Sequence, residues 1–167
     1  MHDNGSLKIT TSGDREILIS RDFDAPRRLV FQAMTTPELL KRWLWGPDGW
    51  EMTVCESDAK PGGQFVHVWR HAAGNEMKMS GVYREVSPER IVRTESFEFG
   101  CNAQEGEQLA SMVLTEDGDR TKLRLTVLYP SREARDATIA SGMERGLAAS
   151  YGRLDELLAA PVGQGSR

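Results

Sequence analysis

The sequence predicts an α+β fold, in which seven antiparallel strands form one sheet that is accompanied by two short helices and a long C-terminal helix. Three observations predict it. Apolar residues alternate with polar ones at 15–23 and again, in six short runs, between residues 50 and 130. Turn signals separate the six runs at short intervals, which is typical of antiparallel hairpins. Helical spacing occurs in the 24–44 region and after residue 130.

The first strand and the two short helices are expected to follow one another directly. The strand covers residues 15–23, where Ile17, Ile19 and Phe23 alternate with the polar residues Ser20 and Asp22. One helix is expected to begin around Pro26, because proline fits the first helical turn. The second should begin at Pro37, with Thr36 as its N-cap.

Several of the six later strands are apolar on both sides, which indicates a sheet that is strongly curved or has covered edges. The last element is expected to be one unbroken helix, with Ser131 as its N-cap and its end near Ala160. Its apolar residues recur three or four positions apart, so one face of the helix must lie on the sheet.

Composition limits the class of protein. The chain has 167 residues, 39% hydrophobic content, a formal charge of −4 and a pI near 5.5. One compact domain is expected over residues 15–160, with a polar tail at 1–14 and a flexible tail at 161–167. The acidic balance argues against a nucleic-acid or anionic-membrane partner. Because no apolar run approaches about 20 residues, we expect no membrane span and a cytoplasmic protein.

The cysteines and histidines do not predict a metal or redox site. Cys55 and Cys101 lie far apart without an export signal, so both are expected to be reduced thiols. His2, His67 and His71 lack the spacing of metal ligands. Nucleotide-binding and hydrolase motifs are also missing, so no cofactor is expected.

Four separated segments of the sequence carry a family resemblance. They are "DAPRRLVFQAMTTPELLKRWLWGP" at 24–47, "KPGGQFVH" at 60–67, "SGVYREVSPERIVRTESFE" at 80–98 and "YPSREARDATIASGMERGLAASYGRLDELL" at 129–158. Together they are similar to the SRPBCC or START-like superfamily, in particular its bacterial branch related to the C-terminal domain of the activator of the heat-shock-protein-90 ATPase. This resemblance implies the helix-grip (START/Bet v-like) fold, in which a curved sheet grips the long C-terminal helix.

The resemblance also implies a cavity between the concave face of the sheet and the long helix, where small apolar ligands usually sit. It places the tryptophan-rich segment "WLWGPDGW" near one end of this cavity, with Trp43 anchoring the second helix. The candidate ligand-binding residues are Trp45, Trp50, Phe65, His67, Trp69, Met79, Tyr83, Glu95, Met112, Met143, Leu147 and Tyr151. For the aromatic residues and methionines, ordinary core packing is the alternative interpretation.

Glu95 is the most informative candidate, because it shares a strand face with Arg93 and Phe97. If that face is concave, Glu95 should pair with Arg93, with His67 or with a polar ligand group, since an unpaired buried charge is costly. A bulge that turns Glu95 to solvent is the alternative. Glu95 and His67 are also the only candidates for catalysis as acid and base.

Three functions are compatible with these observations. The first is binding of a small, mainly apolar ligand that is lipid-, aromatic- or polyketide-like. The second is a cyclase-, isomerase- or hydrolase-type enzyme that uses Glu95 and His67. The third, suggested only by the family name, is a co-factor of a chaperone ATPase in a stress response. Either a monomer or a homodimer fits the apolar surface of the strands.

Overall fold

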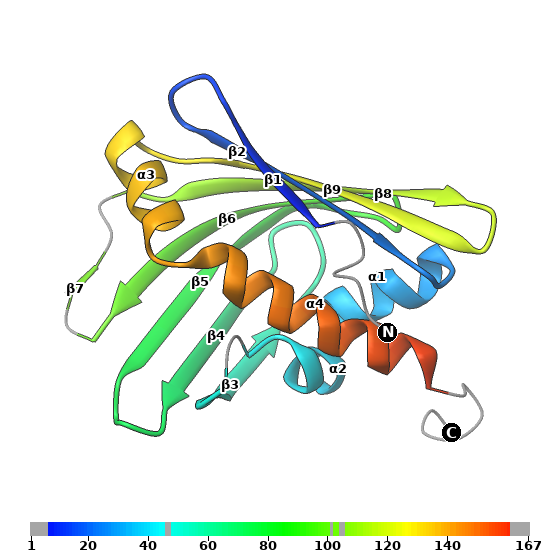
Figure 1. Cartoon of the computed structure of the whole chain (residues 1–167), viewed down its shortest axis with the longest axis horizontal. Helices are drawn as coiled ribbons and strands as arrows, with labels where there is room; N and C mark the ends of the chain where they lie inside the picture. Colours follow the sequence, from blue (N-terminus) through cyan, green and yellow to red (C-terminus); the bar gives the residue numbers. More distant parts are fainter. Residues whose placement is uncertain (1–6, 46–47, 101, 104–105, 161–167) are drawn as a thin grey trace.

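The computed structural model describes residues 7–45, 48–100, 102–103 and 106–160 and shows one strongly bent antiparallel sheet with a helix across its concave face (Figure 1). The strands follow the order β1-β2-β9-β8-β6-β5-β4-β3, and β7 pairs with β6 beside this path. The predicted α+β class and curved sheet are therefore confirmed. The described strands are β1 (Lys8–Ser12), β2 (Glu16–Phe23), β3 (Trp50–Ser57), β4 (Gln64–His71), β5 (Glu76–Val86), β6 (Arg90–Phe99), β7 (Asn102–Ala103), β8 (Gln108–Asp117) and β9 (Arg120–Leu128).

The predicted number of seven strands is wrong, because eight described strands form the main path of the sheet and β7 adds a short pair. β1 is the strand that was missed. It lies inside the segment 1–14 that was expected to be a polar tail, and it pairs with β2 at the edge of the sheet. Four of its five residues are exposed, so no hydrophobic alternation marks it in the sequence. The tails at 1–6 and 161–167 and the residue Cys101 lie outside the described residues.

The helices α1 (Arg27–Thr35) and α2 (Pro37–Trp43) connect β2 to β3, which is the opposite edge strand. Pro37 is the first residue of α2, as predicted, whereas Pro26, expected in the first turn of its helix, is the N-cap residue just before α1. Thr36 is the N-cap residue of α2, but its side chain makes no capping hydrogen bond.

The long C-terminal helix predicted from the sequence is in fact two helices, α3 (Arg132–Ala140) and α4 (Met143–Ala159). Ser131 caps α3 as predicted, since its Oγ accepts a hydrogen bond from the Ala134 N–H at 3.0 Å. Gly142 then adopts a left-handed conformation with φ of 91° and ends the first helix. This break allows α4 to change direction and cross the sheet (Figure 1).

Helix α4 is fixed to the sheet mainly through its C-terminal half. Tyr151 and Leu154 are buried in the core, and Asp155 forms a two-pronged ion pair with Arg21 of β2, with nitrogen–oxygen distances of 2.9 and 2.6 Å. At the other end of the helix, Met143 and Leu147 are only half-buried. The N-terminal half of α4 therefore covers the sheet less tightly than the C-terminal half.

Within the residues that the structure describes, no helix has both the length and the apolar character that a membrane crossing requires.

Candidate functional site

The inner face of the sheet is built from rows of side chains that continue across neighbouring strands. Cross-strand partners point to the same face of a sheet, so the pairing register identifies these rows. The outermost row contains Trp69, Met77 and Phe99, and the next contains Cys55, His67, Met79 and Phe97.

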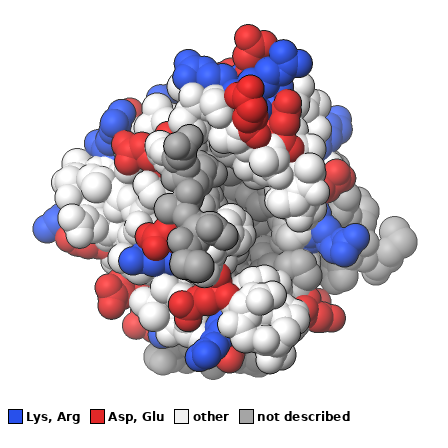
Figure 2. Space-filling view, turned by 90° about the vertical axis from the view of Figure 1, so that its left-hand side faces the viewer, with Lys and Arg blue, Asp and Glu red and all other residues white. Residues whose placement is uncertain are grey.

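This inner face opens towards one end of the molecule. Met79 is 7% exposed, Phe97 is half-buried, and Phe99 at the end of β6 is 53% exposed. Figure 2 looks onto this end and shows a hollow in its middle. The rings of Phe97 and Phe99 are stacked, with centroids 6.4 Å apart, so an aromatic surface remains accessible there.

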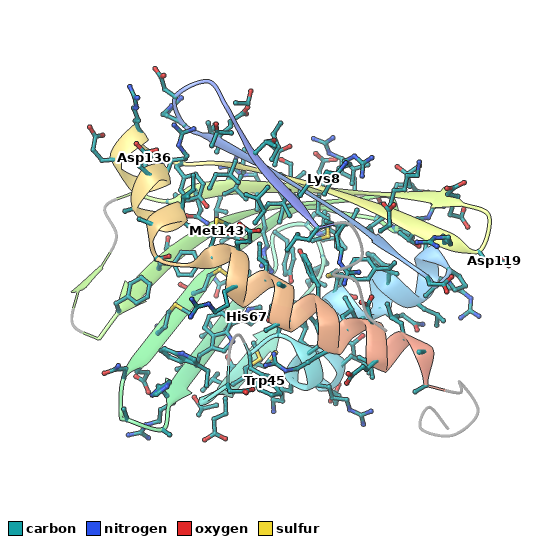
Figure 3. All side chains as sticks on the ribbon, viewed as in Figure 1. Lys8, Trp45, His67, Asp119, Asp136 and Met143 are labelled. Atoms are coloured by element: carbon teal, nitrogen blue, oxygen red, sulfur yellow. The ribbon has the colours of Figure 1, made fainter. Side chains whose placement is uncertain are left out.

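The helix side of the hollow is formed where α4 begins. Met143, the first residue of α4, and Leu147, one turn further, are both half-buried and pack against the core. Figure 3 shows Met143 at the start of α4 and His67 further along, beneath the helix in this view. The hollow therefore has apolar, adaptable side chains on both walls.

His67 is the most unusual residue on this face. It has no exposed surface, and neither of its ring nitrogens has a hydrogen-bond partner among the described residues. Its ring lies between those of Phe65 and Trp69, with centroid distances of 5.1 and 5.6 Å. Burial, together with the positive charge of Arg93, lowers the pKa of His67 from 6.5 to about 3. The imidazole is consequently neutral at physiological pH, with one donor and one acceptor nitrogen.

This low pKa predicts a dependence of stability on pH. The unfolded chain takes up a proton at His67 near pH 6.5, whereas the folded protein resists it down to about pH 3, so stability falls as the pH drops through this window. His67→Phe removes the effect. The free energy of unfolding of the variant minus that of wild type should therefore be about 2 kcal/mol larger at pH 5 than at pH 7, as measured by urea denaturation. If the stability difference between the variant and wild type were the same at pH 5 and pH 7, the pKa of His67 would not be lowered by folding.

Glu95 lies in a polar cluster deeper on the same face. The side chain is 7% exposed, Oε2 accepts a hydrogen bond from Arg93 Nε at 3.0 Å, and Oε1 accepts one from Gln108 Nε2 at 2.8 Å. Of the predicted alternatives, the pairing with Arg93 is the one present. The bulge considered for Glu95 lies instead in β5, between Tyr83 and Glu85. Glu95 and His67 share no hydrogen bond, because His67 has no hydrogen-bond partner in the part of the chain that the structure describes.

Arg93 connects this cluster with the aromatic side chains. Its guanidinium lies 4.0 Å from the centroid of the Phe65 ring, a cation–π contact. Burial acts to lower the pKa of Arg93, but Glu95 and Tyr83 raise it by more, so the guanidinium stays charged. The Tyr83 hydroxyl is 2.8 Å from Ser57 Oγ. The charges of Arg93 and Glu95 thus compensate each other inside the fold.

Two buried tyrosines have raised pKa values for related reasons. Burial, with a contribution from Glu95, raises the pKa of Tyr129 to about 12. Burial likewise raises the pKa of Tyr151 to about 12. The ring of Tyr151, however, packs in the core against Phe23 and Trp43, with centroids 5.5 and 6.0 Å away. Both phenols therefore stay neutral.

The described part of the tryptophan-rich segment touches the outermost row of the inner face, because Trp69 Nε1 donates a hydrogen bond to the Leu44 carbonyl at 2.6 Å. Trp43 is buried and donates a hydrogen bond to the Ala33 carbonyl at 3.0 Å, as expected for an anchor. Trp45 lies against Arg153, whose guanidinium is 3.2 Å from the ring centroid. Ten residues separate Arg153 from the start of α4, which is about 15 Å along a helix.

The remaining predicted residues are also spread along the sheet. Trp50 faces His71, with ring centroids 5.2 Å apart, at a surface pocket of about 430 Å³ beside the β4–β5 turn. Met112 lies on β8 opposite Ile91 and Leu125, further from the open end. The structure therefore brings Phe65, His67, Trp69, Met79, Tyr83 and Glu95 onto one face of the sheet, and Met143 and Leu147 at the start of α4 pack against the core.

Gln108, which belongs to the polar cluster, and Tyr129, whose pKa is raised in part by Glu95, were not predicted. Period-two alternation along "QLASM" places Gln108 on the same face as Ala110 and Met112, so the signal existed for Gln108. Tyr129 follows the last strand, where alternation gives no information. Among the described residues, no group of three or more His, Cys, Asp or Glu side chains is arranged to hold a metal ion.

A bent antiparallel sheet that grips a C-terminal helix defines the helix-grip class of proteins. Residues 24–159 match the family model described as "Activator of Hsp90 ATPase homolog 1-like protein". The chain belongs to this family, within the SRPBCC superfamily, and the predicted resemblance is confirmed. No curated protein matches the chain significantly.

Several solved bacterial structures share the fold. A Rhodobacter sphaeroides protein is 30% identical, with 92% of this chain and 98% of that chain covered and a TM-score of 0.83. A Chromobacterium violaceum protein is 26% identical over 88% of this chain and 99% of that one, with a TM-score of 0.75. A Mycobacterium smegmatis protein, 22% identical over 92% and 97% of the two chains, has a TM-score of 0.81 and shows the fold alone.

Proposed function

We propose that this protein binds a small, mainly apolar molecule between the inner face of the sheet and the N-terminal half of α4. The observation that carries the proposal is the apolar inner face that stays open at one end, where Phe99 is 53% exposed although it lies on the concave side. The stacked rings of Phe97 and Phe99 extend this apolar face to the surface, and a contiguous apolar surface in a concave site is typical of small-molecule binding.

The composition of the walls supports the same function. Met77, Met79 and Met143 supply flexible, polarizable side chains, and Phe97 and Phe99 supply flat aromatic surface. The charged side chains that share the face of β6 with Phe97 and Phe99, Arg93 and Glu95, neutralise each other. A neutral, largely apolar ligand therefore fits this site better than an ion.

The first test is native mass spectrometry of the freshly purified protein beside a denatured aliquot. We expect a small molecule that co-purifies with the folded protein and is released on denaturation. If the folded protein is free of ligand, thermal-shift and calorimetric measurements with apolar aromatic compounds follow. If no such compound bound or raised the melting temperature, the proposal would be contradicted.

Substitution on α4 should separate binding from folding. Leu147→Gln places an amide in the apolar wall, where its desolvation is unfavourable, so the affinity for an apolar ligand should fall about tenfold or more. Leu147 is only half-buried, so the protein should still fold. Leu158→Gln is the matched control, since Leu158 is also partly buried on α4 but lies about three turns away. Equal losses of affinity in the two variants would place the ligand elsewhere.

A further inference from the structure

His67 is the exception in an otherwise well-paired interior. Three buried side-chain nitrogen or oxygen atoms lack a hydrogen-bond partner in the described part of the chain, and two of them are the ring nitrogens of His67. The third is Nε of Arg21, whose other nitrogens bind Asp155. Buried polar groups in folded proteins are nearly always hydrogen-bonded, so a wholly unpaired imidazole calls for an explanation.

The side chains around His67 do not explain why its imidazole is unpaired. Phe65 and Trp69 flank it along β4, and Cys55 and Met79 lie opposite it on β3 and β5. Aromatic carbon, a thiol and a thioether are weak hydrogen-bond partners at best. A position with such neighbours accommodates leucine or phenylalanine at a lower free energy, because neither side chain has a buried polar atom to satisfy.

His67 lies close to the proposed ligand-binding hollow. It occupies the second row of the inner face, where Met79 and then Phe97 lie beside it, and the outermost row with Met77 and Phe99 borders the hollow. Because His67 has no exposed surface, a ligand can reach it only when a neighbouring side chain moves. Met79, with three rotatable side-chain bonds, is the neighbour best suited to swing aside.

The hydrogen-bonding properties of a neutral imidazole indicate which ligand group fits next to His67. One ring nitrogen donates a hydrogen bond and the other accepts one, and a hydroxyl group can both donate and accept. A carboxylate can only accept, and an ammonium group can only donate and would lie near the positive charge of Arg93. The aromatic rings of Phe65, Trp69 and Phe97 and the methionine sulfurs favour an aromatic body behind that hydroxyl.

We infer that His67 is the group that recognises the ligand, and that the ligand is a neutral aromatic molecule carrying a hydroxyl group. This inference rests on the proposed binding function, and it assigns His67 a role in specificity rather than in catalysis. The hydroxyl inserts next to the imidazole, and the aromatic body fills the space between Phe97 and Met143. The hydroxyl thereby pairs with one of the two ring nitrogens that the protein alone leaves unpaired.

Matched probes test this inference by calorimetry. 2-Naphthol and 2-methylnaphthalene differ by one hydroxyl in place of a methyl group, and 4-ethylphenol and 4-ethyltoluene form a smaller pair of the same kind. Wild-type protein is expected to bind the phenol of a pair about tenfold more tightly than its methyl analogue. His67→Phe should remove this preference while binding of the methyl analogue is retained, and His67→Gln should keep part of it.

A measurement on wild-type protein avoids any effect of the substitutions on folding. In ¹⁵N NMR of the imidazole ring, 2-naphthol should shift the His67 nitrogen resonances, and 2-methylnaphthalene should leave them nearly unchanged. If wild type bound both members of a pair equally, or if His67→Phe kept the preference for the phenol, the inference would be wrong while the binding function stood. If no member of either pair bound, the proposed binding function itself would be contradicted, and this inference with it.

Discussion

Replacing Asp155 by alanine is expected to lower the free energy of unfolding by about 3–5 kcal/mol, because it leaves the guanidinium of Arg21 buried without its counter-charge. The Arg21 side chain is only 1% exposed, and it also lies 4.8 Å from the centroid of the Phe23 ring, so it cannot turn to solvent without disturbing the core. The ion pair joins β2 to α4 across 134 residues of sequence. Chemical denaturation in urea measures the loss.

Two controls define the origin of this loss. Glu85→Ala removes the carboxylate of an exposed ion pair with Arg90, and its effect should stay within about 0.5 kcal/mol. The double variant Arg21→Met, Asp155→Leu removes both charges and should recover most of the stability lost in Asp155→Ala. If the double variant were as unstable as the single one, packing rather than the uncompensated charge would be responsible.

Gly81→Ala is expected to destabilise the protein by at least about 3 kcal/mol or to prevent folding. Gly81 lies in the middle of β5, where a Cβ atom would overlap the backbone carbonyl oxygen of Thr94 on β6 and come within 2.9 Å of Phe65 Cε1. A backbone atom of a central strand cannot move aside in the way that a flexible side chain can. The two strands would have to separate next to the polar cluster of Glu95.

Gly152→Ala provides the contrasting control. Gly152 lies within α4, and a Cβ atom there would meet no other atom within 4 Å. Since alanine is a better helix former than glycine, this variant should gain up to about 1 kcal/mol. Thermal and urea unfolding of the two variants should therefore change in opposite directions. A Gly81→Ala protein as stable as wild type would mean that β5 and β6 are further apart than described.

The periodicity of apolar residues along the sequence explains why much of the fold was predictable. Alternation identified β2 and, apart from the two-residue β7, the strands from residue 50 onward, and it also placed Glu95 and Arg93 on one face. The missed strand β1 and the single helix predicted in place of α3 and α4 are errors that occurred where hydrophobic periodicity is weak or does not change. β1 is a polar edge strand that buries little, and Gly142 interrupts a helical pattern that continues on both sides of it.

The details of the site depend on contacts between distant parts of the chain, which local patterns do not report. The alternation around His67 predicts its face, but the absence of hydrogen-bond partners follows from Cys55 and Met79 on the neighbouring strands. In the same way, Gln108 reaches Glu95 only because β8 pairs with β6. The family resemblance placed Trp45 and Trp50 near one end of the cavity, and in the structure they pack against Arg153 and His71.

The most direct test of ligand binding inside the fold is methyl NMR of protein labelled with ¹³C at the methionine methyl groups. Titration with 2-methylnaphthalene should shift the signals of Met77, Met79 and Met143, which border the hollow, and should leave Met34, buried in α1, nearly unchanged. Shifts confined to these three methionines would support a ligand between the sheet and the start of α4. If none of the three signals moved at saturating ligand, or if only Met34 responded, the central claim would be wrong.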